Sequence, residues 1–426
     1  MDSETKHLLS LRAIRERAKI VWAAAQAGDL SHFDLHEDRL EDVAKFVLSV
    51  IERDFGPDKF DTIPPHGRWQ HFEVGGVPRV ANLIESWKSQ GVSDEIEITR
   101  RLIDLFFVSV LLDAGAGDVW RYVEPGTENK YERSEGIAVA SLYMFNEFAF
   151  TTGEIPAVNG QGLVNLSADA LAAGFQSSGS NEMLGVESRA ALLQSLGTSL
   201  LDHPKVFGEE GRPGNVVDYM LKHAGTSDDL DVLVLWDALQ DVLIPSWPKD
   251  RTTVNGVPVG DAWPLSTLQK QATTTTAGIQ PFHKLTQWLT YSLMVPFQRL
   301  LKKRWANSDA LTALAEYRNG GLFVDLGAIT LKPEALEKGL KASGQELPLF
   351  DASDDVIVEW RALTLGLLDA VYEKIVASIE ERYKVHLSMA QVLEAGTWKS
   401  GREIAAQKRP TTKSSPILMR SDGTLF

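Results

Sequence analysis

The sequence of 426 residues contains no cysteine. This absence excludes disulfide bonds, Cys-ligated zinc or iron–sulfur sites and a thiol nucleophile, but it does not indicate a redox compartment. Long apolar runs are missing as well, because the longest, Leu105–Leu112, is far below the about 18–20 residues that cross a bilayer. The N-terminal residues also lack the apolar core of a signal peptide. We therefore expect a cytoplasmic protein that does not contact membranes.

The sequence has fewer positively than negatively charged residues. It contains 43 Lys and Arg and 58 Asp and Glu, which gives a formal net charge of −15. An acidic chain without a basic block is a poor match for duplex nucleic acid, so we expect no nucleic-acid partner. A small phosphorylated ligand needs only one or two cationic groups and is compatible with this charge. The sequence does not determine the oligomeric state.

Hydrophobic residues recur at helical spacing along most of the chain, which predicts an all-α protein. Strand signals are few: a hairpin turn at Asn255-Gly256 and a short extended segment at Leu322–Leu326. Irregular loops are expected at 56–80 and 245–280. We expect one large helical domain, residues 56–426, with N-terminal helices of residues 1–55 packed on it. The expected helices cover roughly residues 5–27, 37–55, 94–113, 134–150, 167–176, 186–202, 214–224, 228–244, 281–304, 308–317, 332–341, 354–384, 388–394 and 400–407.

A histidine-containing segment raises the question of a metal site. His66 and His71 frame a stretch that also holds Arg68 and Glu73. Its spacing matches no standard zinc pattern, and Gly67 argues against a single helical face. We therefore expect packing of this loop or contact with a ligand, and no bound metal.

A second segment alternates His32, Asp34 and His36 ahead of a predicted helix. On a strand, these three polar side chains would share one face. The following helix favours a different interpretation, in which Asp34 is its N-cap.

Polar residues interrupt otherwise apolar helices at four places. Each group is explained by a buried ion pair, for example Glu359 with Arg318 or Lys284 with Glu316, or by a shared polar pocket. Because unpaired buried charges cost several kcal/mol, four such groups in one chain favour the pocket. The groups are Arg133–Gly136, His283–Tyr291, Glu316–Gly321 at the predicted end of a helix that the glycines stop, and Glu359–Arg361.

Eight uncommon strings in one order closely resemble the uracil-catabolism protein four family, from about residue 64 to the end. The resemblance implies a role in the pyrimidine degradation route that passes through ribosylurea and ends in urea. It does not define the individual chemical step. The strings are LLDAGAGDVW (ending at Trp120), RSEG (133–136), ESRAALLQSLG (187–197), PFHKLTQWLTYSL (281–293), LTALAEYRNGGLFVD (311–325), VEWRALT (358–364), GTWKSGREIA (396–405) and SDGTLF (421–426).

A more distant resemblance is to the queuosine-salvage N-glycosylases, all-helical proteins related in fold to helix-hairpin-helix DNA glycosylases. Lys284 and Gln287 match their lysine-x-x-glutamine helix, Glu316-Tyr317-Arg318 matches their acidic-Tyr-Arg helix end, and Glu359 and Arg361 match their Glu-x-Arg helix. The departures are a Glu in place of the glycosylase Asp, Asn319-Gly320-Gly321 in place of a proline, and Leu285-Thr286 in place of a basic-small pair. They bear more on base specificity than on reaction type.

These resemblances imply cleavage of an N-ribosidic bond, in which positive charge develops at C1′ and a nearby carboxylate stabilises it. Glu316 is the predicted catalytic carboxylate. The expected ligand is a phosphorylated ribosyl compound, with no cofactor and no metal. The predicted substrate-binding residues are Lys284, Gln287, Arg318, Asn319, Glu359, Arg361, His283, Tyr291, His71 and Arg68.

Three functions stay open at this point. The first is an N-glycosidase that hydrolyses ribosylurea 5-phosphate to urea and ribose 5-phosphate. The second is a metal-dependent hydrolase of the ring-opened pyrimidine, in which His66, His71 and a carboxylate hold the metal. The third is a non-catalytic nucleotide-binding subunit of the same pathway.

Overall fold

The computed structural model describes residues 2–113, 115–117, 119–248 and 251–420. Within these residues the chain is mostly helical, and its strands are two or three residues long and occur only in two-stranded pairs. The predicted all-α class with a minor β hairpin is confirmed. No helix among the described residues is long and apolar enough to cross a membrane. The string SDGTLF, and Ala114 and Asp118 within LLDAGAGDVW, lie outside the described residues.

The chain divides into two compact units, each assembled from separate stretches of sequence. Among the described residues, unit 1 contains 2–66, 252–284 and 310–420, and unit 2 contains those within 67–251 and 285–309. The boundary predicted near residue 55 falls inside the first segment of unit 1.

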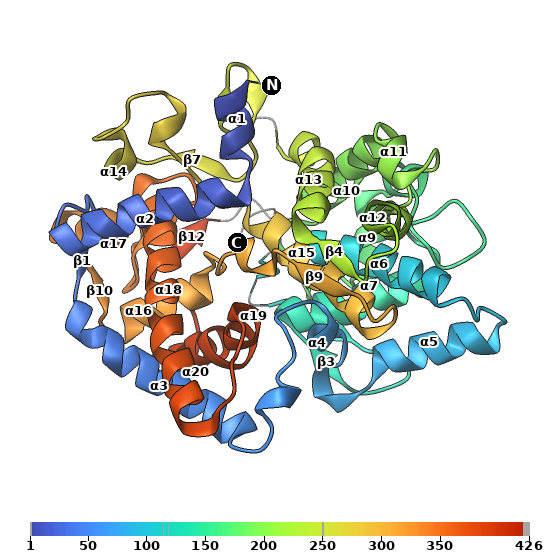
Figure 1. Cartoon of the computed structure of the whole chain (residues 1–426), viewed down its shortest axis with the longest axis horizontal. Helices are drawn as coiled ribbons and strands as arrows, with labels where there is room; N and C mark the ends of the chain where they lie inside the picture. The colour runs from blue at the N-terminus through green and yellow to red at the C-terminus, as the bar shows by residue number, and fades with distance from the viewer. Residues whose placement is uncertain (1, 114, 118, 249–250, 421–426) are drawn as a thin grey trace. The chain divides into compact units, whose positions relative to one another are not determined.

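Unit 1 is built around one long helix, α18, which begins after the N-cap Asp354. Helices α2 and α3 pack on α18, and α16 contacts both α18 and α20 (Figure 1). Ser10 caps α2, and Gly28 ends it in a left-handed conformation. The single helix predicted over 5–27 is therefore wrong at its start, because the cap at Ser10 separates α1 from α2. Its helices are α1 (Ser3–Leu8), α2 (Leu11–Ala27), α3 (Leu40–Phe55), α14 (Ser266–Gln269), α16 (Tyr317–Asp325), α17 (Pro333–Ser343), α18 (Asp355–Tyr383), α19 (Met389–Val392) and α20 (Trp398–Lys408), with a π turn at Leu393–Thr397.

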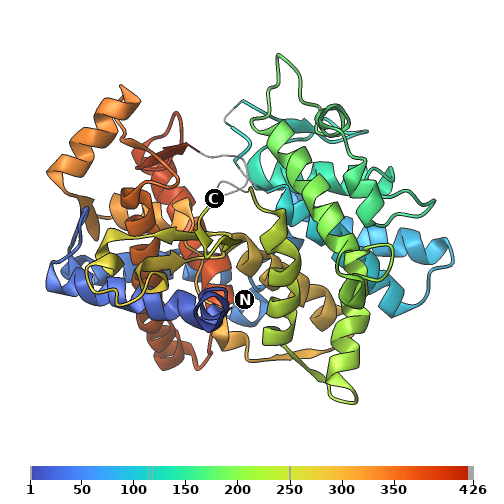
Figure 2. The same ribbon diagram turned by 90° about the horizontal axis from the view of Figure 1, so that it is seen from above.

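The strands of unit 1 join segments that are distant in sequence. The β7–β8 pair lies along α2 (Figure 2), and β5–β6 is the predicted hairpin, with Asn255 and Gly256 both at positive φ. Strand β1 pairs antiparallel with β10, so Asp34 lies in a strand opposite Thr330. The prediction that Asp34 caps a helix is therefore wrong, because pairing with a segment three hundred residues away determines its conformation. The strands are β1 (Phe33–Leu35), β5 (Thr253–Val254), β6 (Val257–Pro258), β7 (Ala262–Pro264), β8 (Ile279–Pro281), β10 (Ile329–Leu331), β11 (Leu349–Asp351) and β12 (Leu418–Arg420).

Unit 2 has α6 at its centre, where every residue from Arg101 to Leu111 is buried. Helix α7 contacts α6, and α10 contacts α8, α9 and α13. The helices are α4 (Trp69–Phe72), α5 (Arg79–Ser89), α6 (Glu95–Leu111), α7 (Arg133–Asn146), α8 (Gly160–Val164), α9 (Ala168–Gly174), α10 (Val186–Leu201), α11 (Pro204–Phe207), α12 (Val216–Ala224), α13 (Val232–Leu243) and α15 (Lys284–Arg299), whose first residue belongs to unit 1. The strands are β2 (Tyr122–Val123), β3 (Lys130–Tyr131), β4 (Asp229–Asp231) and β9 (Arg304–Ala306).

Candidate functional site

Glu316 is the N-cap of α16, which begins at the next residue. Its two carboxylate oxygens accept the backbone N–H groups of Arg318 and Asn319, the former at 2.9 Å. The predicted helix over 308–317 and the predicted extended segment at Leu322–Leu326 are therefore wrong. The helix starts where the sequence pattern placed its end, and it continues through both glycines.

Close packing explains the two glycines inside α16. A Cβ atom on Gly320 would lie 2.8 Å from the Trp360 ring, and one on Gly321 would lie 3.0 Å from Pro416. On the facing helix α20, a Cβ on Gly401 would lie 2.1 Å from the Arg318 carbonyl oxygen. The glycines thus let α16 approach its neighbours closely and fix the start of the helix, where Glu316 sits.

The carboxylate of Glu316 is buried, with 8% of the residue exposed. Burial raises the pKa of Glu316 above the usual range for a glutamate, because an ionised carboxylate is poorly solvated there. The N–H groups of the helix start and the positive charge of Lys284 act in the opposite direction and favour the ionised form. Unit 1 therefore brings Glu316 and Lys284 into one electrostatic environment.

Asn319 lies on the first turn of α16 and is 1% exposed. Its side-chain N–H donates to the Leu314 carbonyl at 3.2 Å. Its Oδ1 is buried and accepts no hydrogen bond from any residue that the structure describes. A buried acceptor of this kind is costly unless a partner arrives, so Asn319 is suited to receive an N–H or O–H group of a ligand.

Arg318 lies two residues after Glu316, the predicted catalytic residue. Its Nη1 donates to the Lys413 carbonyl at 2.8 Å, and its guanidinium lies 4.8 Å from the centre of the Tyr317 ring. Only 4% of the residue is exposed. The structure thus holds a second cationic group at the start of α16.

Arg361 on α18 forms an ion pair with a carboxylate that the sequence analysis did not identify. Its two terminal nitrogens each lie 2.8 Å from one oxygen of Asp261, a bidentate pair that is buried on both sides. The guanidinium also lies 3.9 Å from the centre of the Phe282 ring. The Arg361 charge and several hydrogen bonds hold the pKa of Asp261 far below its usual range, against the effect of burial.

Asp261 also organises the start of α15. Its Oδ2 accepts the Lys284 backbone N–H at 3.0 Å, and its backbone carbonyl accepts the N–H groups of Phe282 and His283. Nothing in its neighbours Gly260 and Ala262 marks Asp261 as functional, because its partners lie elsewhere in the sequence. Sequence analysis therefore missed it.

His283 is buried, and its Nε2 lies 3.1 Å from the Leu8 carbonyl oxygen. Since a carbonyl only accepts, this nitrogen carries the proton. Burial lowers the pKa of His283, which favours the neutral ring. The Nε2–H is thus directed to the backbone of α1.

Glu359 is fully buried on α18 and accepts hydrogen bonds from the N-terminal segment of unit 1. Its oxygens accept the backbone N–H groups of Ser31 at 2.8 Å and His32 at 2.6 Å, and the Thr267 hydroxyl. These hydrogen bonds show that Glu359 holds the backbone at Ser31 and His32 in place. Contact with substrate stays a prediction for this residue.

The other predicted ligand residues, Arg68, His71, Gln287 and Tyr291, belong to unit 2 and are all buried there. Arg68 donates to Ser109 and to Asp113, the latter at 3.0 Å, and its Nη1 lies 3.3 Å from the His71 Nδ1. Burial lowers the pKa of Arg68. Unit 2 thus brings Arg68 and His71 together.

His66 belongs to unit 1, where its Nδ1 lies 2.5 Å from a Glu394 oxygen. Across the described ranges, no group of three or more His, Cys, Asp or Glu side chains is arranged to hold a metal ion. The metal-dependent hydrolase therefore gains no support from these residues.

Comparison with known proteins extends over the whole chain. A family model described as "Protein of unknown function (DUF1688)" matches residues 7–426. The chain is 49% identical over 436 residues to "Protein urg3" of Schizosaccharomyces pombe and 44% identical over 444 residues to "Uracil catabolism protein 4" of Lachancea kluyveri. Both alignments cover all of this chain and all of the relative.

Proposed function

This chain belongs to the DUF1688 family, and we propose that it is an N-glycosidase of uracil catabolism that hydrolyses ribosylurea 5-phosphate. The name of the Lachancea kluyveri relative, "Uracil catabolism protein 4", supports the pathway. The buried carboxylate of Glu316 supports the reaction, and it is the observation on which the proposal depends.

Hydrolysis of the N-ribosidic bond needs a negative charge close to C1′. In this proposal Glu316 supplies it in the ionised form, which two backbone N–H groups and the charge of Lys284 favour against the effect of burial. A preorganised charge in such a site stabilises an oxocarbenium-like transition state without reorganising at the moment of reaction, an effect worth about 3–4 kcal/mol. In this proposal Glu316 acts in this way and also accepts a proton from the attacking water.

Other residues of unit 1 suit the rest of the substrate. Lys284 supplies a point charge and Arg318 a planar fork for a phosphate. The Asn319 Oδ1 can accept an N–H group of the urea or a ribose hydroxyl. Arg361 neutralises Asp261 and, in this proposal, positions Lys284 through it.

The proposed step balances without a co-reactant other than water. The water oxygen forms a bond to C1′ as the C1′–N bond breaks, and the electron pair of that bond passes to the urea nitrogen. One proton of the water moves to Glu316 and is then returned to the leaving nitrogen. The products are urea and ribose 5-phosphate.

The test is incubation of the purified protein with ribosylurea 5-phosphate, followed by assay of free urea and reducing sugar. The variant Glu316→Gln is expected to abolish turnover and retain the fold. Its remaining oxygen still accepts one cap hydrogen bond, and the loss of the other, about 0.5–2 kcal/mol, is partly offset by removal of a buried charge. Glu334→Gln, at an exposed glutamate in the first turn of α17, is the matched control.

Two results would contradict the proposal. Full activity of Glu316→Gln would show that Glu316 does not act at the reacting centre. Absence of urea release by the wild-type protein, combined with a rise in its melting temperature on adding the ligand, would favour a binding subunit instead.

A further inference from the structure

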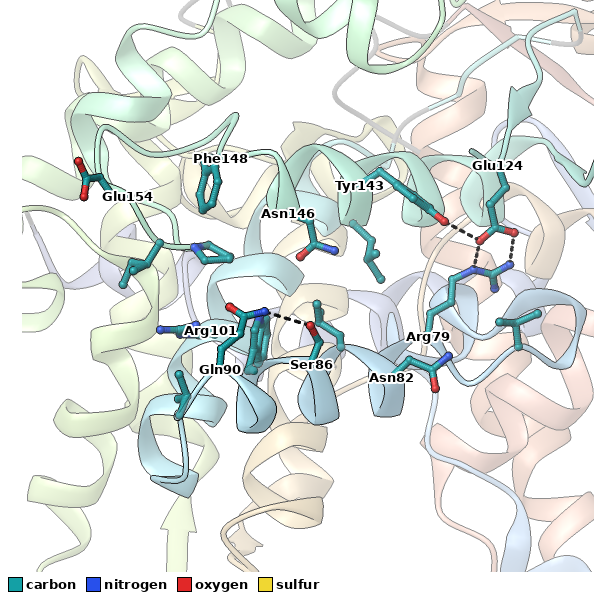
Figure 3. A pocket seen from close by; sticks show the side chains of 17 residues that line it. Arg79, Asn82, Ser86, Gln90, Arg101, Glu124, Tyr143, Asn146, Phe148 and Glu154 are labelled. Atoms are coloured by element: carbon teal, nitrogen blue, oxygen red, sulfur yellow. Dashed lines mark hydrogen bonds and ion pairs between the residues drawn. The ribbon is translucent and has the colours of Figure 1, made fainter. Parts of the chain in front are cut away.

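Unit 2 contains a pocket of about 650 Å³ between α5 and the C-terminal half of α7 (Figure 3). Its lining includes two cations, and both have partners. Arg79 forms a bidentate pair with Glu124, with both contacts at 2.7 Å. The Arg101 Nε donates to Glu97 at 3.2 Å. Among the described residues the pocket therefore gives an anionic ligand no unpaired cation, and the feature that bears on the proposed reaction lies in unit 1.

His283 holds a backbone conformation that most side chains disfavour. Its φ is 43°, in the left-handed region, directly before the first residue of α15. Histidine adopts this region more readily than most residues, but such a position persists only where the surrounding contacts impose it. His283 is 2% exposed, so its ring and its backbone are both enclosed by protein.

The left-handed turn at His283 directs three consecutive N–H groups to Asp261. The N–H groups of Phe282 and His283 donate to the Asp261 carbonyl, at 2.8 and 3.1 Å. The N–H of Lys284 donates to the Asp261 carboxylate at 3.0 Å. Successive N–H groups in a turn of this kind form a concave site for a negative group, which Asp261 occupies here. The turn thus orients Lys284, the first residue of α15.

The ring of His283 is connected to the N-terminal helix α1. Its Nε2–H donates at 3.1 Å to the carbonyl of Leu8, the last residue of α1. Carbonyl groups in the last turn of a helix have no partner within the helix, and His283 supplies one. The Leu8 side chain is buried in a cluster with Val254, Val259, Ala262 and Ile279. Leu8 therefore anchors the carbonyl that holds the His283 ring.

Helix α1 has six residues, fewer than the about 12–15 that an isolated helix needs to be stable in water. Its position therefore depends on contacts with other segments. The Thr276 hydroxyl donates to Glu4 at 2.6 Å, and the Asn255 side-chain amide donates to Asp2 at 3.3 Å. Thr276, Asn255 and His283 all belong to the segment 252–284 of unit 1. Docking of α1 on this segment and the turn at His283 are therefore coupled.

We propose that His283 is a positioning residue, which links the docked helix α1 to Lys284 and so fixes the lysine charge for a phosphorylated ribosyl ligand. This role rests on the proposed function for the identity of the ligand, whereas the link itself is a property of unit 1. The His283 ring donates to the protein instead of to a leaving group. Burial lowers its pKa and keeps it neutral, so it adds no charge beside Lys284.

Two substitutions at His283 separate its hydrogen bond from its backbone conformation. His283→Gln and His283→Met both introduce unbranched side chains of similar length, but only glutamine carries an N–H group for the Leu8 carbonyl. Hydrogen–deuterium exchange of the full chain, measured by mass spectrometry over residues 282–284, reports on the link without any substrate. We expect at least tenfold faster exchange in His283→Met and a rate close to that of the wild type in His283→Gln.

A milder variant keeps the test decisive if His283→Met folds poorly. Thr276→Val removes the hydrogen bond to Glu4 and leaves His283 in place, so it weakens the docking of α1 alone. We expect several-fold faster exchange at 282–284. Thr62→Val is the matched control, since Thr62 also belongs to unit 1 and its hydroxyl donates over the same 2.6 Å, to the Lys59 carbonyl. It is expected to leave exchange at 282–284 unchanged.

The second readout is the steady-state turnover of ribosylurea 5-phosphate. His283→Met is expected to raise KM at least fivefold with a smaller change in kcat, and His283→Gln is expected to keep KM within twofold of the wild type. In a Lys284→Met background, His283→Met is expected to raise KM no further, because the charge through which it acts is gone.

The outcomes distinguish this link from the proposed function. Faster exchange in His283→Met that His283→Gln restores, without urea release by the wild type, would support the link and contradict the glycosidase. Unchanged exchange at 282–284 in both His283→Met and Thr276→Val, or equally fast exchange in His283→Met and His283→Gln, would overturn the link. An equal rise in KM with and without Lys284 would also overturn it.

Discussion

The buried pair of Asp261 and Arg361 allows a prediction with a definite size. In Asp261→Asn the shape of the side chain is retained, but Arg361 keeps its charge without a carboxylate, at 2% exposure. Removing one partner of a buried ion pair costs about 3–5 kcal/mol, because the other charge is left uncompensated. We expect a loss of this size in the free energy of unfolding.

The loss is measurable by thermal and denaturant unfolding. For a cooperative unit of roughly 200 residues, about 3 °C of melting temperature corresponds to 1 kcal/mol, so we expect a drop of about 10 °C. A double variant, Asp261→Leu with Arg361→Met, removes both charges and is expected to recover more than half of the loss. Full recovery is not expected, since Asp261 also accepts hydrogen bonds from Trp263 at 2.8 Å and from the Lys284 backbone.

The Asp261–Arg361 pair also leads to a prediction about how the stability of the protein depends on pH. The pKa of Asp261 is lowered in the folded state, so its stabilising contribution is complete above the unfolded pKa of about 4 and is lost as the pH falls toward the folded value. The difference in melting temperature between the wild type and Asp261→Asn should therefore narrow below about pH 4. A loss under about 1 kcal/mol at neutral pH, or a double variant less stable than both single variants, would refute the reasoning.

Three further variants separate structural from functional roles. Gly401→Ala places a Cβ 2.1 Å from the Arg318 carbonyl and is expected to cost about 2–3 kcal/mol or more, whereas Gly179→Ala, in open space, should be nearly neutral in denaturant unfolding. Glu359→Gln is expected to lower stability by about 2–3 kcal/mol with an unchanged KM for the remaining folded enzyme, because its contacts are with the protein's own N–H groups; a raised KM at unchanged stability would instead make it a substrate ligand. Lys284→Met removes a charge that lowers the pKa of Glu316, so the acidic limb of the kcat/KM profile should move to higher pH, and an unmoved limb would contradict their coupling.

Local pattern predicted the helices well and the partners of buried polar groups poorly. The sequence of 354–384 predicted α18 to within a residue or two at each end, because Asp354 caps its start and no proline interrupts the segment. At Glu316 the pattern failed. Gly320 and Gly321 were interpreted as a helix stop, whereas close contacts with Trp360 and Pro416, from elsewhere in the sequence, determine their positions.

The candidate site shows the same division between local and long-range information. Glu316, Arg318 and Asn319 are neighbours in sequence, so their grouping could be predicted. Asp261 is separated from Arg361 by 100 residues, and no local signal indicates which carboxylate a buried arginine will find. The structure was needed to assign Arg361 to Asp261.

Asp261 connects the stability of unit 1 to the geometry around Glu316. It neutralises Arg361, and it also holds the backbone N–H of Lys284, whose charge favours the ionised form of Glu316. A substitution at Asp261 therefore acts twice, since it leaves a charge buried and releases the residue that sets the electrostatic environment of the carboxylate. Any fraction of Asp261→Asn that stays folded should accordingly show a shifted pH–rate profile, whereas Glu334→Gln, at an exposed glutamate on α17, should leave the acidic limb of that profile where it was.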